Sequence, residues 1–213
     1  MLDFIVAALA TLVVVVDPVG LAPSFIVLTH HLSQAGRRKV AVNASVLAGG
    51  ILVGATFGGD WLLRALSISM SAFRIAGGLL LLWIAFEMVF ERHSERQSRT
   101  AEEAVDDQFQ HVSAFPLAVP LMAGPGAITA TVLLAGQAGS DPVKLAFLVV
   151  VIAIVMILCL VVFLGAESIR KVLGVTGSIV VARLLGIILA SLAVQFVIDG
   201  ISQAWGGRLA AAG

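Results

Sequence analysis

Six long apolar segments, separated by polar loops, constrain this chain more than any other feature of its sequence. A helix needs about 20 mostly apolar residues to cross the hydrocarbon core of a membrane. Six segments reach that length: 4–29, 40–59, 71–90, 112–138, 145–166 and 178–198. The alternation typical of a membrane β-barrel is absent, and helices satisfy their backbone hydrogen bonds internally. The sequence therefore predicts an all-α, polytopic membrane protein with six transmembrane helices.

Composition agrees with a membrane protein and excludes several other classes. Hydrophobic residues make up 60% of the chain and charged residues 12%, with zero formal net charge. No basic cluster is dense enough to indicate a nucleic-acid partner. The single cysteine, Cys159, cannot form a disulfide within the chain, and no Cys/His group has metal-site spacing. We therefore expect no metal and no other cofactor.

The basic residues between the segments predict the topology. Eight lie in the loops after the first, third and fifth segments: Arg37, Arg38, Lys39, Arg92, Arg96, Arg99, Arg170 and Lys171. The opposite side has three: Arg64, Lys144 and Arg208. Because basic loops stay in the cytoplasm, the first side is predicted to be cytoplasmic and both termini non-cytoplasmic.

The first and fourth segments are interrupted by similar stretches, "VVVVDPVGLAPSF" and "VPLMAGPGAIT". Proline suits the first turn of a helix and steers the preceding residue away from helical geometry. Asp17 and Pro18 are thus expected to act as N-cap and first residue of a new half-helix, and Gly124-Pro125 to start another. Two half-helix N-termini then meet near the midplane, where their free N–H groups favour an anion.

The polar stretch at 91–111 divides the chain into two three-helix halves, 1–90 and 112–213. Each half has its interruption in the first helix and an arginine with a glycine three positions later in the third, at Arg74/Gly77 and Arg183/Gly186. Because three is odd, the second half must enter the membrane from the opposite face. The predicted architecture is two inverted repeats with a substrate site at their interface.

Three segments resemble the MarC family of bacterial inner-membrane proteins: "FPLAVPLMAGPGAIT" from Phe115, "FRIAGGLLLLWIAFEMVF" from Phe73 and "ARLLGIILASLAVQFVIDGI" from Ala182. The resemblance covers nearly the whole chain and implies a six-helix protein of the bacterial inner membrane. Some family members are described as neutral amino acid transporters. Relatives often have asparagine after the glycine of the first interruption, whereas this chain has Leu21.

The candidate substrate or ion site lies at the two interruptions and consists of Asp17, Pro18, Gly20, Pro23, Gly124, Pro125, Gly126, Ala127 and Thr129. A carboxylate inside a span indicates function by default, although Asp17 also qualifies as a simple helix cap. The glycines and prolines after position 123 allow a ligand to approach the backbone or merely kink a packed helix. Thr129 either lines the cavity or bonds to its own helix.

Arg74, Arg183 and Gln195 are secondary candidates with structural alternatives. For the two arginines the alternative is snorkelling or binding carbonyl groups of another element. For Gln195 it is a hydrogen bond across helices. Gly50, Gly54 and Gly58 are spaced by four and predict a face for close helix packing.

The best interpretation is a secondary transporter of a small solute, coupled to a proton or a sodium ion. An acidic break beside a basic break matches a zwitterion, and the small residues around them favour small neutral amino acids. An intramembrane enzyme is not expected, because one midplane carboxylate and one cysteine supply neither a carboxylate pair nor a cysteine pair. A channel or a non-transporting scaffold stays open as an alternative, as does oligomerisation.

Overall fold

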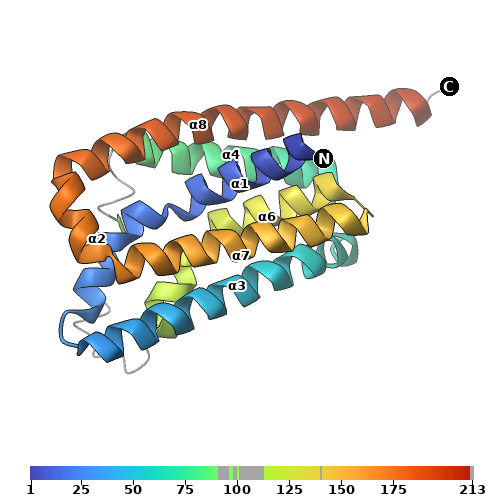
Figure 1. The fold of residues 1–213 in the computed structure, drawn as a ribbon. Coiled ribbons are helices and arrows are strands. Elements are labelled where there is room, and N and C mark those ends of the chain that lie inside the picture. Colours follow the sequence, from blue (N-terminus) through green and yellow to red (C-terminus); the bar gives the residue numbers. More distant parts are fainter. Residues whose placement is uncertain (91–95, 98–99, 101–112, 140, 212–213) are drawn as a thin grey trace.

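The computed structural model describes residues 1–90, 96–97, 100, 113–139 and 141–211, which form a bundle of helices (Figure 1). The elements are α1 (Leu2–Val16), α2 (Pro18–Thr29), α3 (Gln34–Ala65), α4 (Met70–Val89), η1 (Ser113–Met122), α6 (Pro125–Ala138), α7 (Pro142–Leu164) and α8 (Ala166–Ala211). No strand occurs among these residues, which confirms the all-α prediction. The predicted linker at 91–111 lies mostly outside them.

The lengths of the helices fit the predicted crossings. Five stretches are long and apolar enough to span a membrane: Leu2–Thr29, Gln34–Ala65, Met70–Val89, Pro142–Leu164 and Thr176–Trp205. A sixth crossing exists if Pro116–Met122 and Pro125–Ala138, which are bent by 56°, form one span. By length and composition, the described chain therefore has five candidate crossings, or six if the bent pair forms one span.

Side-chain caps explain where several helices begin. Ser33 caps α3 by accepting a hydrogen bond from the Gly36 N–H at 3.3 Å, so this helix starts well before the apolar segment predicted at 40–59. Ser69 caps α4 through the N–H of Ala72 at 3.2 Å. The cap at Ser33 thus extends α3 beyond its apolar part, whereas the cap at Ser69 starts α4 at its apolar part.

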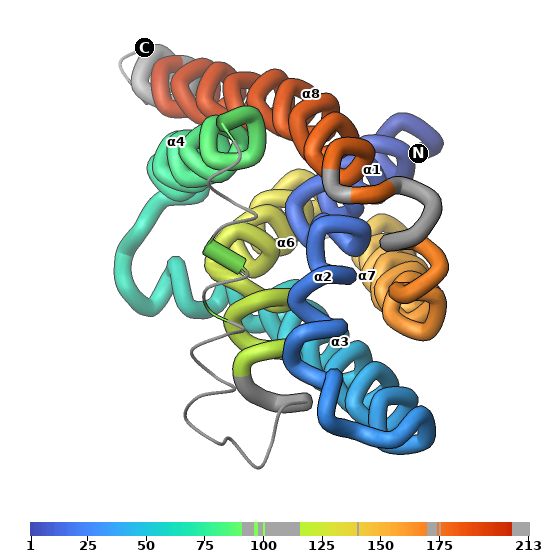
Figure 2. The backbone as a smooth tube through the Cα atoms, turned by 90° about the vertical axis from the view of Figure 1, so that its left-hand side faces the viewer, coloured from blue at the N-terminus to red at the C-terminus, as the bar shows by residue number. Residues whose placement is uncertain are grey.

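The helices form a bundle in which α4 lies beside α8 on one side and α3 lies on the other, with α1, α6 and α7 between them (Figure 2). Glycine allows the close contact of α4 with α8. A Cβ atom at Gly78 would lie 2.8 Å from the Ala193 carbonyl oxygen, and one at Gly200 would lie 2.9 Å from that of Ser71. Gly186, predicted from the repeated arginine–glycine spacing, contacts α4 in the same way.

The glycine spacing in α3 does not mark a packing face within this chain. A Cβ atom at Gly50, Gly54 or Gly58 would have no neighbour within 4 Å, and all three residues are exposed. The buried face of the helix carries Ala44, Ala48 and Leu52 instead. The prediction of close packing at these glycines is therefore wrong for contacts inside the described chain, because spacing identifies a face but not the direction in which it points.

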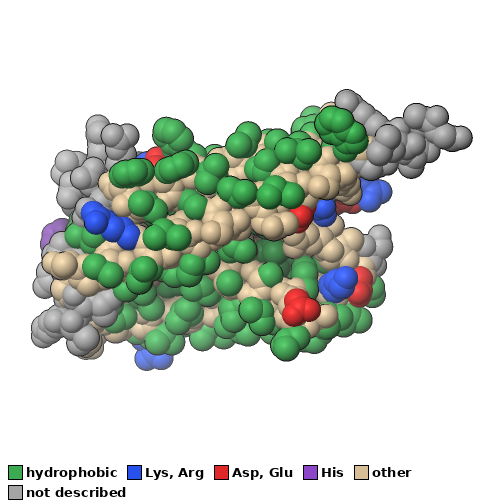
Figure 3. All heavy atoms as spheres, turned by 90° about the horizontal axis from the view of Figure 1, so that it is seen from above, with side chains coloured by type: hydrophobic (Ala, Val, Ile, Leu, Met, Phe, Trp, Pro, Cys, Tyr) green, Lys and Arg blue, Asp and Glu red, His purple; other side chains and the backbone are tan. Residues whose placement is uncertain are grey.

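Charged side chains gather toward the two ends of the bundle, and hydrophobic side chains cover the surface between them on the face drawn in Figure 3. At one end Arg37 pairs with Glu167 at 2.6 Å, and Arg96 pairs with Glu87 at 3.1 Å. At the other end Arg64 pairs with Asp60. Exposed apolar residues between charged ends are the expected surface of a helical bundle that faces lipid.

Candidate functional site

The first break is formed by Asp17, which ends α1 and starts α2. Its backbone adopts a left-handed conformation, with φ 49° and ψ 66°, one that aspartate tolerates better than most residues. The Asp17 N–H still donates to the Val13 carbonyl at 3.0 Å, and its own carbonyl accepts from the Leu21 N–H at 3.1 Å. The predicted N-cap at Asp17 and first helical residue at Pro18 are therefore confirmed.

The carboxylate of Asp17 is buried and only half used by this cap. Oδ1 accepts a hydrogen bond from the Gly20 N–H at 3.0 Å. Oδ2 has no hydrogen-bond partner among the described residues, and the residue is 1% exposed. Burying a charged oxygen without a partner is costly, so Oδ2 is the atom at this break that is available for a ligand or a cation.

The second break lies between η1 and α6. Gly124 has extended backbone angles, and Pro125 occupies the first turn of α6, as predicted. No side chain caps this helix, in contrast to α2. The following Gly126 and Ala127 are buried, and the Ile128 N–H donates the first helical hydrogen bond to the carbonyl of the N-cap Gly124 at 3.0 Å. The start of α6 therefore presents uncapped N–H groups in a buried position.

The two breaks lie next to each other in the bundle. A Cβ atom at Gly126 would lie 3.4 Å from Cγ1 of Val15, two residues before Asp17. It would also lie 2.5 Å from Cδ1 of Ile84 on α4. The missing side chain at Gly126 thus allows α6, α1 and α4 to meet at the point where both spans are broken.

Two further polar side chains near the first break are not among the predicted site residues. Cys159 is buried in α7, one turn before Phe163, whose ring stacks on that of Phe25 in α2 with centroids 4.7 Å apart. Ser24 is 1% exposed, and its hydroxyl has no hydrogen-bond partner among the described residues. A serine inside an apolar span was a usable signal. No sequence signal identified Cys159, because the sequence does not show which face of α7 is buried.

The other predicted residues of the two breaks have different environments. Pro18 is buried, and Gly20 faces the Asp17 carboxylate directly. Pro23 and Pro125 are exposed. Thr129 is half-buried, and its Cγ2 would lie 2.7 Å from a Cβ atom at Gly77. The structure therefore brings together the residues that flank Asp17 and Gly126 and leaves Pro23 on the outside.

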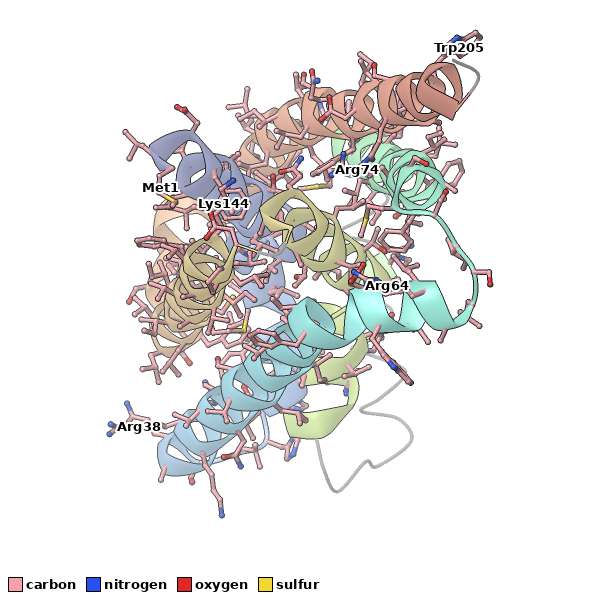
Figure 4. All side chains as sticks on the ribbon, turned by 90° about the vertical axis from the view of Figure 1, so that its right-hand side faces the viewer. Met1, Arg38, Arg64, Arg74, Lys144 and Trp205 are labelled. Atoms are coloured by element: carbon pink, nitrogen blue, oxygen red, sulfur yellow. The ribbon has the colours of Figure 1, made fainter. Side chains whose placement is uncertain are left out.

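The three secondary candidates lie away from both breaks. Arg74 donates from Nη2 to the Gly136 carbonyl at 3.5 Å, which is the predicted binding of another element's carbonyl group, and Figure 4 shows it beside α6. Arg183 is exposed on α8. Gln195 is also exposed and donates to Asp199 of its own helix at 2.7 Å. The predicted hydrogen bond of Gln195 across helices is therefore wrong.

The charges at the two breaks are complementary. One break offers a carboxylate oxygen without a partner, and the other offers helix N–H groups at the positive end of a helix dipole. No group of three or more His, Cys, Asp or Glu side chains that could hold a metal ion occurs in the described part of the chain.

These features define an all-helical membrane protein with several apolar helices long enough to span a membrane and helix breaks at Asp17 and Gly124. The model of MarC family integral membrane proteins matches residues 2–205, and the chain belongs to this family. Similar proteins include the UPF0056 membrane protein of Archaeoglobus fulgidus, which is 36% identical over 203 residues, 95% of this chain and 94% of the relative.

Relatives from two bacteria show the same extent of similarity. The UPF0056 membrane protein YhcE of Escherichia coli is 34% identical over 194 residues, 91% of this chain and 90% of the relative. A UPF0056 membrane protein of Aquifex aeolicus is 33% identical over 198 residues, 93% of this chain and 92% of the relative. No solved structure matches the chain.

Proposed function

We propose that this protein is a secondary transporter of a small zwitterion, with small neutral amino acids as the best candidates. The observations that carry the proposal are the buried, half-unpartnered carboxylate of Asp17 and the uncapped N-terminus of α6, where Gly126 packs against Val15, two residues before Asp17. An ammonium group fits the first, and a carboxylate fits the N–H groups of Gly126 and Ala127. The tight packing at Gly126, where even a Cβ atom would lie 2.5 Å from Cδ1 of Ile84, favours a substrate with a small side chain.

The proposal includes an inverted repeat in which α1 corresponds to η1, α2 to α6, α3 to α7 and α4 to α8. The packing supports this pairing because contacts recur when the halves are exchanged. The α2–α8 contact has its counterpart in α6–α4, and the contacts of α3 with η1 and α6 have theirs in those of α7 with α1 and α2. The contacts α3–α7 and α4–α8 join counterparts directly, whereas the contact of α1 with α8 has no counterpart of similar size between η1 and α4.

Such a repeat favours a carrier because two equivalent halves can exchange their conformations about a central site. Asp17 is 1% exposed, so a substrate reaches it only when the bundle opens. The same carboxylate is the proposed position of the coupling proton or sodium ion. We place the protein in a bacterial inner membrane, with the end that carries Arg37 on the cytoplasmic side, because the basic residues are concentrated at that end.

Uptake into proteoliposomes tests the transport claim. Labelled alanine is presented to vesicles that contain the wild-type protein, the Asp17→Asn variant or no protein, with a proton or sodium gradient. The proposal predicts saturable uptake that unlabelled glycine and serine inhibit, and no gradient-driven accumulation by Asp17→Asn. Uptake that is linear in concentration would favour a channel. No uptake of any member of a panel of small metabolites would favour a non-transporting scaffold.

A further inference from the structure

An apolar groove runs along the outer surface between α3 and α7, away from the two breaks. It has a volume of about 300 Å³ and is lined by residues such as Val46 and Gly49 on α3 and Ala153 and Met156 on α7. Val46 and Ala153 are exposed, so the groove opens to the exterior of the bundle. On the lipid-facing surface of a membrane protein, such a groove has the width and chemistry for a hydrocarbon chain.

A larger and more polar hollow continues from one end of this groove. It has a volume of about 1180 Å³ and lies where α2 ends, α3 begins and α7 meets α8. Val42 lines both spaces, so the groove and the hollow adjoin at this residue of α3. Arg37, Arg38 and Lys39 line the hollow. The two spaces together form one groove with a basic end and an apolar end.

Two of the three cations are available for a ligand. Arg37 is held by Glu167 at 2.6 Å and by the Thr29 and His30 carbonyl groups at 3.1 and 3.3 Å. Arg38 and Lys39 are exposed and have no hydrogen bond or ion pair with any described residue. Arg38 points outward from the start of α3 in Figure 4. The basic end therefore has two positive charges that no described residue compensates.

A polar group also lies inside the apolar part. Ser45 lines the groove and is 5% exposed, yet its hydroxyl has no hydrogen-bond partner among the described residues. Serine in a membrane helix commonly bonds back to its own helix, as Thr56 does to the Leu52 carbonyl at 3.0 Å. Ser45 is seven residues after Arg38, which places it about 10 Å further along α3.

We infer that this groove binds an anionic glycerophospholipid. Arg38 and Lys39 bind its phosphate, the Ser45 hydroxyl donates to an ester carbonyl, and an acyl chain lies between α3 and α7. The arrangement follows the chemistry of the ligand in order: phosphate, ester and hydrocarbon. Basic pockets between transmembrane helices at the membrane surface are a known way of binding acidic headgroups.

A second copy of the chain fits this groove less well. A symmetric dimer through this surface brings the same patch of both copies together. Arg38 and Lys39 would then face their own counterparts, and the acidic Glu167 nearby is already paired with Arg37. The uncompensated charge therefore favours an anionic partner.

Native mass spectrometry of the purified full chain tests the inference, with dioleoylphosphatidylglycerol and dioleoylphosphatidylcholine as probes. We expect tighter binding of the anionic lipid. We expect Arg38→Gln/Lys39→Gln to weaken that binding by about thirtyfold, as for the loss of two basic contacts at an anionic surface. The matched control Arg64→Gln/Lys144→Gln removes two charges from the opposite end of the same helices, labelled in Figure 4, and should retain the preference.

A second pair of variants tests the apolar end without changing any charge. Ala153→Phe fills the groove and should weaken binding of phosphatidylglycerol. Ala146→Phe, on an exposed position of α7 that does not line the groove, should not. Equal affinity for the two lipids, equal losses in both members of either pair, or competition by inorganic phosphate or glycerol 3-phosphate as strong as by the lipid would overturn the inference.

Discussion

The carboxylate of Asp17 occupies the space that a side chain at Gly20 would need. A Cβ atom built at Gly20 would overlap Oδ2 and lie 2.7 Å from Cγ of Asp17. The glycine also donates its N–H to Oδ1 at 3.0 Å. Gly20 thus determines where the carboxylate lies in two ways, through a hydrogen bond and through the absence of a side chain.

Gly20→Ala should therefore damage the site directly. The new methyl group forces the carboxylate out of its position or moves the start of α2, and overpacking of this kind typically costs about 1–3 kcal/mol. Loss of alanine binding and a lower thermal unfolding temperature in detergent are the expected results. Gly50→Ala is the matched control, because its Cβ meets nothing within 4 Å. Similar behaviour of the two variants would contradict the role assigned to Gly20.

Replacing Asp17 should separate its structural role from its charge. Asparagine caps helices about as well as aspartate, so Asp17→Asn should unfold at nearly the wild-type temperature, whereas Asp17→Ala should lose about 1 kcal/mol of stability. Both should lose gradient-driven alanine accumulation. Thermal unfolding and uptake, measured on the same preparations, check this. If Asp17→Asn transports normally, Asp17 is only a helix cap.

The contact between the two breaks should be sensitive at Gly126. Gly126→Ala places a methyl group against Ile84, 2.5 Å from its Cδ1 atom. We expect weaker alanine binding, and we expect the second substitution Ile84→Val to restore much of it by removing that terminal methyl group. Binding measured for both single variants and the double variant gives the coupling. Purely additive losses would show that the contact does not matter.

Labelling of introduced cysteines tests the predicted orientation. Cys159→Ala removes the native thiol, and His31→Cys and Leu66→Cys then place single thiols at exposed positions on opposite ends of α3. An impermeant maleimide added to intact cells should label position 66 and spare position 31, because the basic end is predicted to be cytoplasmic. The reverse pattern would place the termini in the cytoplasm.

The helical class and both breaks were predictable because they depend on local chemistry, and the six predicted crossings agree with the structure if the bent pair of η1 and α6 forms one span. Proline at positions 18 and 125 determines where α2 and α6 start, whatever surrounds them. Apolar length alone determines which segments can cross a membrane. The π-helical geometry of η1, which contains Pro116 and Pro120, was not predicted from the local sequence.

Directions of side chains were not predictable, because in a membrane helix both the buried and the lipid-facing sides are apolar. The exposed glycines at positions 50, 54 and 58 and the outward Gln195 are consequences of this. The burial of Cys159 is another, because it depends on the rotation of α7 about its own axis. The meeting of Gly126 with Val15 followed from the proposed repeat rather than from either segment alone.

Binding of alanine, compared with alaninamide and propionate, tests the central claim most directly. The amide lacks the carboxylate that the α6 N-terminus would hold, and propionate lacks the ammonium group that Asp17 would hold. Isothermal titration with purified protein should show alanine binding at least about tenfold tighter than either analogue, because a hydrogen bond to a charged group contributes roughly 1.5–3 kcal/mol. Equal affinity for all three, or binding of an uncharged metabolite in place of alanine, would contradict the zwitterion site.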